Sequence, residues 1–212
     1  MGSPVTCAHG LPIGDCMAPG CPVWLGDPHG DRPWRTGWSL SWYSGAAPHD
    51  TWVGGLVHDA KYGQAPLLDR ERYADELSAR MMAFIGEVYE PGGLPFSVIM
   101  SPPSHNVKPF ELAAYLCEQI AEGFELTNAS AHLRESHSVS TMKAVPDVAE
   151  RLALLEGALT LDPPTNMHRP KGCLIVDDVF ETGATAAAIC RVLQTRFPDS
   201  QYHVLTAACT RR

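Results

Sequence analysis

The strongest indication of the fold is the stretch from Cys173 to Thr185, where a short apolar run ends at two adjacent acids. Such a run is typical of a parallel strand that is buried on both faces and whose carboxyl end is open to a ligand. The following Thr182-Gly183-Ala184-Thr185 supplies hydroxyls, a conformationally permissive glycine and small side chains directly before an alanine-rich helix. The stretch therefore predicts a strand, a turn and a helix start.

A helix N-terminus after such a turn suits a phosphate group, because the first amide hydrogens have no partner within the helix and the dipole favours an anion. The carboxylates of Asp177 and Asp178 would repel that phosphate, so we expect them to bind ribose hydroxyls of the same ligand. Adjacent strand residues point to opposite sides, so the two acids should have different roles. The alternative is a buried strand that ends in solvated acids, followed by a loop with a threonine helix cap.

The run from Leu174 to Thr185 resembles the phosphoribosyl-pyrophosphate (PRPP) motif of type I phosphoribosyltransferases, since Asp-Asp-x-x-x-Thr-Gly-x-Thr follows apolar positions. The resemblance implies that Asp177 and Asp178 hold the ribose 2- and 3-hydroxyls and favour a developing cation during catalysis. The residues that it implies for the 5-phosphate are Thr182, Gly183, Ala184 and Thr185. Glu181 departs from the small or hydroxyl residue common in that family and places a negative charge beside the phosphate loop.

Strands and helices are expected to alternate along the rest of the chain. The expected elements are a helix from about Asp69 to Val88, a strand over 96–100, a helix from Pro109 to Ile120, a strand from Phe124 to Arg134, a helix from about Asp147 to Leu159, a helix after the PRPP-like motif to about Phe197, and a last strand over 202–208. This repetition predicts right-handed crossovers and a mainly parallel sheet. The fold class is α/β, and the resemblance implies the type I phosphoribosyltransferase fold.

A second turn, 101–106, follows the strand over 96–100, at a position where open α/β sheets bind ligands. The resemblance implies that this turn is the pyrophosphate loop. Its two prolines have no amide hydrogen, so the donors would come from Ser104, His105 and Asn106, with Lys108 as a counter-charge. The segment 135–145 is predicted to be a long loop, and in the family such a loop closes over PRPP. Its candidate pyrophosphate contacts are Arg134, His137 and Lys143; the alternative is an ordinary solvated loop.

The N-terminal segment, residues 1–52, is predicted to be an appendage to a phosphoribosyltransferase-like domain over 53–212. The spacing Cys-x-His-x6-Cys-x4-Cys places Cys7, His9, Cys16 and Cys21 among turn residues, and such a ligand set suits structural Zn²⁺. The alternatives are a mobile tail with free thiols, or a ligand set that uses His29 or His49.

All five tryptophans fall between residues 24 and 52. The alternation over 38–43, a turn over 44–49 and a second apolar run over 52–57 predict a hairpin whose aromatic face packs on the main domain. Base stacking on an exposed ring is the alternative.

Composition and charge exclude several function classes. The formal net charge of −8 argues against a broad nucleic-acid-binding surface. No apolar run approaches the roughly 20 residues of a membrane span, and the N-terminus lacks signal-peptide features, so a cytoplasmic protein is expected. The cysteines at 117, 173, 190 and 209 are expected to be buried thiols of a reducing compartment. The sequence leaves the oligomeric state open, a homodimer included.

The order of parts resembles the ComF-like branch of the phosphoribosyltransferases. The shared features are an N-terminal zinc knuckle, Lys61-Tyr62 after an aromatic stretch, the Pro-rich turn, Leu133-Arg134 and Glu150-Arg151. Two departures are the sparsely basic 106–111 after the turn and Leu154 where the branch has asparagine. The resemblance implies an enzyme that uses PRPP and Mg²⁺ to ribosylate a nitrogen nucleophile of unidentified structure. The alternative is a non-catalytic, PRPP- or nucleotide-binding accessory protein in DNA uptake, repair or regulation.

Overall fold

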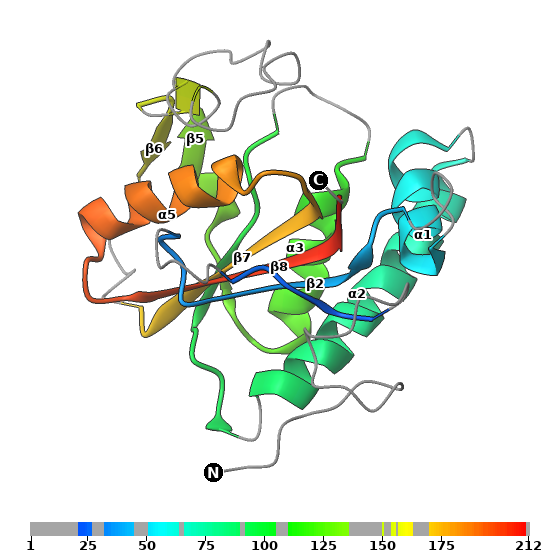
Figure 1. Ribbon diagram of the computed structural model, residues 1–212, viewed down its shortest axis with the longest axis horizontal. Helices are drawn as coiled ribbons and strands as arrows, with labels where there is room; N and C mark the ends of the chain where they lie inside the picture. Colours follow the sequence, from blue (N-terminus) through cyan, green and yellow to red (C-terminus); the bar gives the residue numbers. More distant parts are fainter. Residues whose placement is uncertain are drawn as a thin grey trace.

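A computed structural model describes residues 21–26, 32–44, 51–63, 66–89, 92–104, 110–135, 150, 154–155, 157–162 and 170–210. In this part of the chain a six-stranded sheet has the order β1-β2-β8-β7-β3-β4 (Figure 1). Its strands are β1 (Val23–Trp24), β2 (Thr36–Trp42), β3 (Val98–Met100), β4 (Thr127–Asn128), β7 (Gly172–Phe180) and β8 (Gln201–Cys209). Only the β1–β2 pair in it is antiparallel, which confirms the predicted mainly parallel α/β sheet.

Helices cover both faces of this sheet. The described helices are α1 (Trp52–Tyr62), α2 (Leu67–Tyr89), α3 (Leu112–Gly123), α5 (Ala184–Arg196) and the 3-10 turn η2 (Ser130–His132). Strand β7 alternates between the faces: Leu174 and Val176 pack in the cluster that contains α1, α2 and α3, whereas Cys173 and Ile175 pack in the cluster that contains α5. A separate two-stranded sheet pairs β5 (Leu133–Glu135) with β6 (Leu159–Leu161).

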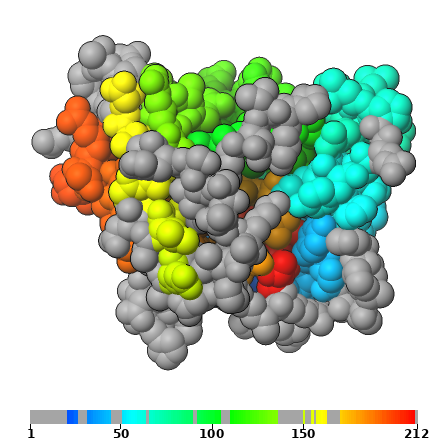
Figure 2. All heavy atoms as spheres, turned by 90° about the horizontal axis from the view of Figure 1, so that it is seen from above, coloured from blue at the N-terminus to red at the C-terminus, as the bar shows by residue number. Residues whose placement is uncertain are grey.

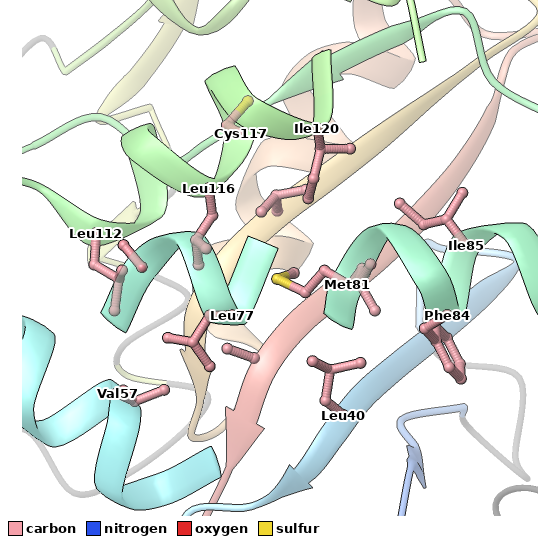
Figure 3. Packing of buried hydrophobic residues seen from close by; sticks show 14 of the residues in the cluster. Leu40, Val57, Leu77, Met81, Phe84, Ile85, Leu112, Leu116, Cys117 and Ile120 are labelled. Carbon is pink, nitrogen blue, oxygen red and sulfur yellow. The ribbon is translucent and has the colours of Figure 1, made fainter. Parts of the chain in front are cut away.

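Helix α2 supplies much of the core on the face of the sheet that α1, α2 and α3 cover. Its residues Leu77, Met81 and Ile85 recur every four positions and are fully buried, as an amphipathic helix requires. Figure 3 shows this row beside Leu116 and Ile120 of α3. The sequence predicted both helices, although α3 begins at Leu112 rather than at Pro109, which lies outside the described residues. No described helix has the length and hydropathy needed to cross a bilayer.

The predicted aromatic hairpin is wrong in its second strand, because residues 52–57 form the start of α1. The Thr51 hydroxyl caps this helix by accepting from the Gly54 amide at 2.9 Å. The buried positions of α1 include Val53, Leu56, Val57 and Ala60, an i, i+3, i+4, i+7 pattern that indicates a helix. Strand β2 instead pairs with β1 and, in parallel, with β8 of the main sheet. The domain division at residue 52 stays a prediction.

Two further elements differ from the prediction. The expected strand from Phe124 to Arg134 is divided into β4, η2 and β5, and Glu125 turns the chain with a φ of 54°. The expected helix to Leu159 ends earlier: Gly157 has a φ of +80° and Leu159 begins β6. In both places long-range strand pairing decided the structure where the local pattern was weak.

Candidate functional site

The candidate site lies at the carboxyl-terminal edge of β3, β7 and β8. Because these strands are parallel, their carboxyl ends meet at the same edge. Seen from above in Figure 2, the ends of β7 and β8 lie between α5 (orange) on one side and the α1–α2 pair (cyan) on the other. Strand β3 pairs with β7 only as far as Met100 opposite Ile175, while β8 pairs with β7 up to Phe180. The acids therefore do not end the strand as predicted; they lie within β7, paired to β8 on one side and open toward the turn after β3 on the other.

Asp177 and Asp178 have different partners. The Oδ1 atom of Asp177 accepts a hydrogen bond of 2.8 Å from the backbone amide of Asp178. The Asp178 carboxylate instead forms an ion pair with the Lys61 ammonium. The Nζ atom lies 2.9 Å from Oδ1 and 2.8 Å from Oδ2. The ion pair is largely shielded, since the Lys61 and Asp178 side chains are only 22% and 14% exposed. Lys61 comes from the last turn of α1 and was not among the predicted site residues.

Burial sets the protonation of this group. It raises the pKa of Asp177 to about 8, with the charge of Asp178 adding to the effect and the Asp178 amide and Lys61 opposing it. Burial also lowers the pKa of Lys61, but the charge and hydrogen bond of Asp178 outweigh it, so the net shift is upward. The ammonium is therefore charged at neutral pH, and Asp177 is a carboxyl group that ionises far less readily than an exposed one.

The face alternation of β7 changes directly after the acids. The bond to Lys61 puts Asp178 on the α1 side, the following Val179 packs against that same cluster, and Phe180 packs in the α5 cluster. Strand β8 also places two successive residues on one face, since Ala207 and Ala208 both pack in the cluster that contains α1, α2 and α3. The pairing register between β7 and β8 is therefore kept. Neither strand has the extra residue of a β-bulge, so β7 and β8 change their face alternation together. The consequence is that Phe180 lies on the α5 side of the sheet, under the phosphate loop.

Gly183 makes the predicted phosphate turn. It has a φ of +82° and a ψ of 1° immediately before α5. A Cβ atom there would lie 2.7 Å from Cζ of Phe180 and 3.0 Å from Cη2 of Trp34, so both the backbone angle and the packing favour glycine. The Thr182 hydroxyl accepts from the Ala184 amide at 3.1 Å. The remaining first-turn amides of α5 have no acceptor within the helix and are suited to an anion.

Aromatic residues from the N-terminal segment support this turn, and the sequence did not indicate them. The Trp34 and Phe180 rings make an edge contact with centroids 6.1 Å apart. The Arg32 guanidinium lies 5.2 Å from the Trp34 ring centroid and 5.4 Å from that of Phe180. Glu181, the departure from the family pattern, has an exposed side chain.

The turn after β3 is described only as far as Ser104. The backbone amide of Ser101 donates to the Ser130 hydroxyl at 2.9 Å, which ties the turn to the segment between β4 and β5. Ser104 is exposed, and its hydroxyl donates to Glu111 at 2.8 Å. The other predicted residues here, His105, Asn106 and Lys108, lie outside the described residues.

Arg134 lies in β5, exposed and paired across the small sheet with Thr160. Among the described residues no hydrogen bond or ion pair joins it to Asp177 or Asp178. His137 and Lys143 lie outside the described residues. The structure thus brings together the acids, the phosphate turn and Lys61, and leaves the role of Arg134 a prediction.

Of the predicted zinc ligands, Cys7, His9 and Cys16 lie outside the described residues, and Cys21 is 5% exposed just before β1. The described part of the chain contains no cluster of three or more potential metal-ligating side chains. The zinc site stays a prediction.

Comparison with known proteins gives little further guidance. No family model matches the chain, and no curated protein matches it. Among solved structures, the chain is similar to a Helicobacter pylori xanthine-guanine-hypoxanthine phosphoribosyltransferase, with a TM-score of 0.38 and 14% identity, covering 64% of this chain and 71% of that chain. A likeness of this degree does not define an activity.

Proposed function

We propose that the protein binds PRPP at the carboxyl edge of β7 and transfers its phosphoribosyl group to a nitrogen nucleophile, releasing pyrophosphate. The observation that carries the proposal is the arrangement on β7 and α5. Two carboxylates lie within the strand, and five residues after Asp178 a left-handed glycine opens the N-terminus of a helix. Carboxylates suit ribose hydroxyls and the helix terminus suits a 5-phosphate, so together they fit a ribose 5-phosphate group.

The two acids would bind the ribose and stabilise positive charge. As the bond from C1 to the pyrophosphate oxygen breaks, the leaving group takes the electron pair and the ribose ring gains oxocarbenium character. Asp178, in contact with Lys61, provides negative charge near that ring, and Asp177, whose raised pKa favours the protonated carboxyl group at neutral pH, would hydrogen-bond the ribose. The nitrogen nucleophile then forms the new bond at C1 and loses a proton to solvent. Positioning and charge account for the catalysis, so no covalent intermediate with the protein is needed.

Mg²⁺ would accompany PRPP and neutralise the departing pyrophosphate. The hard carboxylate oxygens of Asp177 and Asp178 are of the kind that Mg²⁺ prefers. However, both oxygens of Asp178 are engaged by Lys61, so this acid would offer Mg²⁺ little direct coordination and PRPP itself would hold most of the ion. Zn²⁺ bound by Cys7, His9, Cys16 and Cys21 is a separate, structural proposal. Metal analysis of protein purified without chelator should find about one zinc per chain.

The second candidate is a ComF-like accessory protein that binds PRPP or a nucleotide without turnover. Glu181 favours it, because a carboxylate at the phosphate turn opposes an incoming anion. The acceptor is expected to be a base or amine, and the segments that would contact it lie largely outside the described residues.

The test measures PRPP binding and pyrophosphate release together. Calorimetry with PRPP and Mg²⁺ should show binding by the wild type, and a panel of bases and amines should reveal an acceptor that triggers pyrophosphate release. The double variant Asp177→Asn with Asp178→Asn should lose binding, whereas Asp199→Asn, exposed at the opposite end of the sheet, should not. Binding without release under every acceptor would support the accessory role, and absence of binding would overturn both functions.

A further inference from the structure

The proposed ligand has to compete with an ion pair that already occupies the site. Ribose hydroxyls would donate to the Asp178 carboxylate, yet both of its oxygens accept from the Lys61 ammonium at 2.8 to 2.9 Å. An ammonium has three donors, and the two carboxylate oxygens can engage two of them. A bound ribose therefore has to share the carboxylate with Lys61 or displace it.

The chemistry of PRPP indicates where a displaced ammonium would go. Its pyrophosphate is attached to C1, next to the 2-hydroxyl, so a carboxylate that binds this hydroxyl lies beside the most highly charged part of the ligand. Lysine carries a compact charge on a flexible four-carbon stem, which can follow the negative charge with little movement of the backbone. The sequence after the turn at 101–106 is sparsely basic over 106–111, which leaves the leaving group in need of a cation from elsewhere in the chain.

The backbone of Lys61 is held in place by an arginine from the next helix. Arg70 donates from Nε to the Ala60 carbonyl at 2.7 Å and from Nη2 to the Lys61 carbonyl at 2.6 Å. These are terminal carbonyls of α1 that have no partner within the helix. The same guanidinium lies 5.5 Å from the ring centroid of Phe110, which follows the turn after β3. Arg70 thus ties the end of α1 to Phe110 and bonds to the backbone carbonyl of Lys61 rather than to its side chain.

We propose that Lys61 is a pyrophosphate-binding residue that exchanges its carboxylate partner, Asp178, for the pyrophosphate when PRPP binds, and that Arg70 is the positioning residue that aims it. This inference rests on the proposed function. Lys61 would act as a fixed cation for the leaving group: it donates hydrogen bonds as the C1–O bond breaks and pyrophosphate departs with the electron pair, and it keeps its own proton. The exchange also frees the Asp178 oxygens for the ribose hydroxyls.

The test compares PRPP with ribose 5-phosphate, which lacks the pyrophosphate, by calorimetry on the full chain. In Lys61→Met, the Kd for PRPP should rise roughly 10- to 100-fold, the effect of losing one hydrogen bond to a charged group. The Kd for ribose 5-phosphate should be unchanged or lower, because Asp178 no longer has a competing partner. Lys61→Arg keeps the charge and should restore most of the affinity for PRPP. Lys171→Met is the matched control, since Lys171 is exposed at the opposite end of β7 and bonds to the Leu94 carbonyl.

The positioning role of Arg70 is tested by combining its substitution with that of Lys61. The variant Arg70→Met should weaken PRPP binding in the wild-type background and add no further loss in the Lys61→Met background, as residues that act through one another do. Equal losses in both backgrounds would show that Arg70 does not act through Lys61.

Three results would overturn the proposal for Lys61: an unchanged PRPP affinity in Lys61→Met, an equal loss for PRPP and ribose 5-phosphate, or tighter binding of both. Urea unfolding of Lys61→Met and Lys61→Arg identifies any loss that comes from a damaged fold. If the wild type binds ribose 5-phosphate and PRPP but the PRPP affinity does not depend on Lys61, this inference alone is refuted. If the wild type binds neither ligand, the proposed function is refuted as well.

Discussion

Replacing Gly183 by alanine tests the geometry of the phosphate turn. The left-handed backbone of Gly183, at a φ of +82°, costs a residue with a Cβ atom about 1 to 2 kcal/mol. The new methyl group would also lie 2.7 Å from Phe180 and 3.0 Å from Trp34, and overpacking of that kind costs about 1 to 3 kcal/mol. Gly183→Ala should therefore lower the free energy of unfolding by about 2 to 5 kcal/mol, measured by urea denaturation. Any part of the strain relieved by moving the turn should appear as weaker ribose 5-phosphate binding.

Gly93→Ala separates the two contributions. Gly93 has a similar φ of +74°, but a Cβ atom added there would meet no other atom within 4 Å, so this variant carries the backbone cost alone. Phe180→Leu in the Gly183→Ala background should recover part of the packing cost. If Gly183→Ala destabilises the protein no more than Gly93→Ala does, the placement of Phe180 and Trp34 under the turn is refuted.

Three further predictions concern stability. His203 is 2% exposed, and burial, assisted by Arg35, lowers its pKa to about 4, so the unfolded chain takes up a proton first; the contribution of His203 to stability should fall between about pH 6.5 and pH 4 by up to about 3 kcal/mol, measured as the difference between the wild type and His203→Leu in urea titrations across pH. Asp177 has the opposite sign, because its raised pKa means that the folded state binds more protons; the contribution of Asp177 to stability should decline from about pH 4 to about pH 8, and Asp177→Asn should be more stable than the wild type at the alkaline end. Thr51→Ala removes the cap of α1 and a 2.6 Å bond to the Trp42 carbonyl, so it should cost about 1 to 2 kcal/mol in urea unfolding, whereas a strand over 52–57 would tolerate it.

The sequence predicted the parts of the site that are adjacent along the chain. The acids of β7, the glycine turn and the start of α5 lie within about a dozen residues, so local rules of strand, turn and helix start were sufficient. The same local rules overlooked the change of face after Asp178, because it follows from packing against α1, which is far from β7 in sequence.

Lys61 and Trp34 were missed because their contacts are long-range. Lys61 is 117 positions from Asp178, and no spacing rule joins them. A signal for α1 did exist in the helical spacing from Val53 to Ala60, but the tryptophans that precede it favoured the strand interpretation. Recognising that period would have placed Lys61 in a last helical turn, facing the sheet that carries the acids. For Trp34 no local signal exists, since its contact with Phe180 depends on the change of face in β7.

A crystal structure of the wild-type protein with PRPP and Mg²⁺ would decide whether the edge of β7 is the PRPP site. We expect the 5-phosphate at the first-turn amides of α5, the ribose hydroxyls at Asp177 and Asp178, and the Lys61 ammonium turned from Asp178 toward the pyrophosphate. A ligand bound elsewhere, or a phosphate placed away from Gly183 and Ala184, would contradict the proposed site.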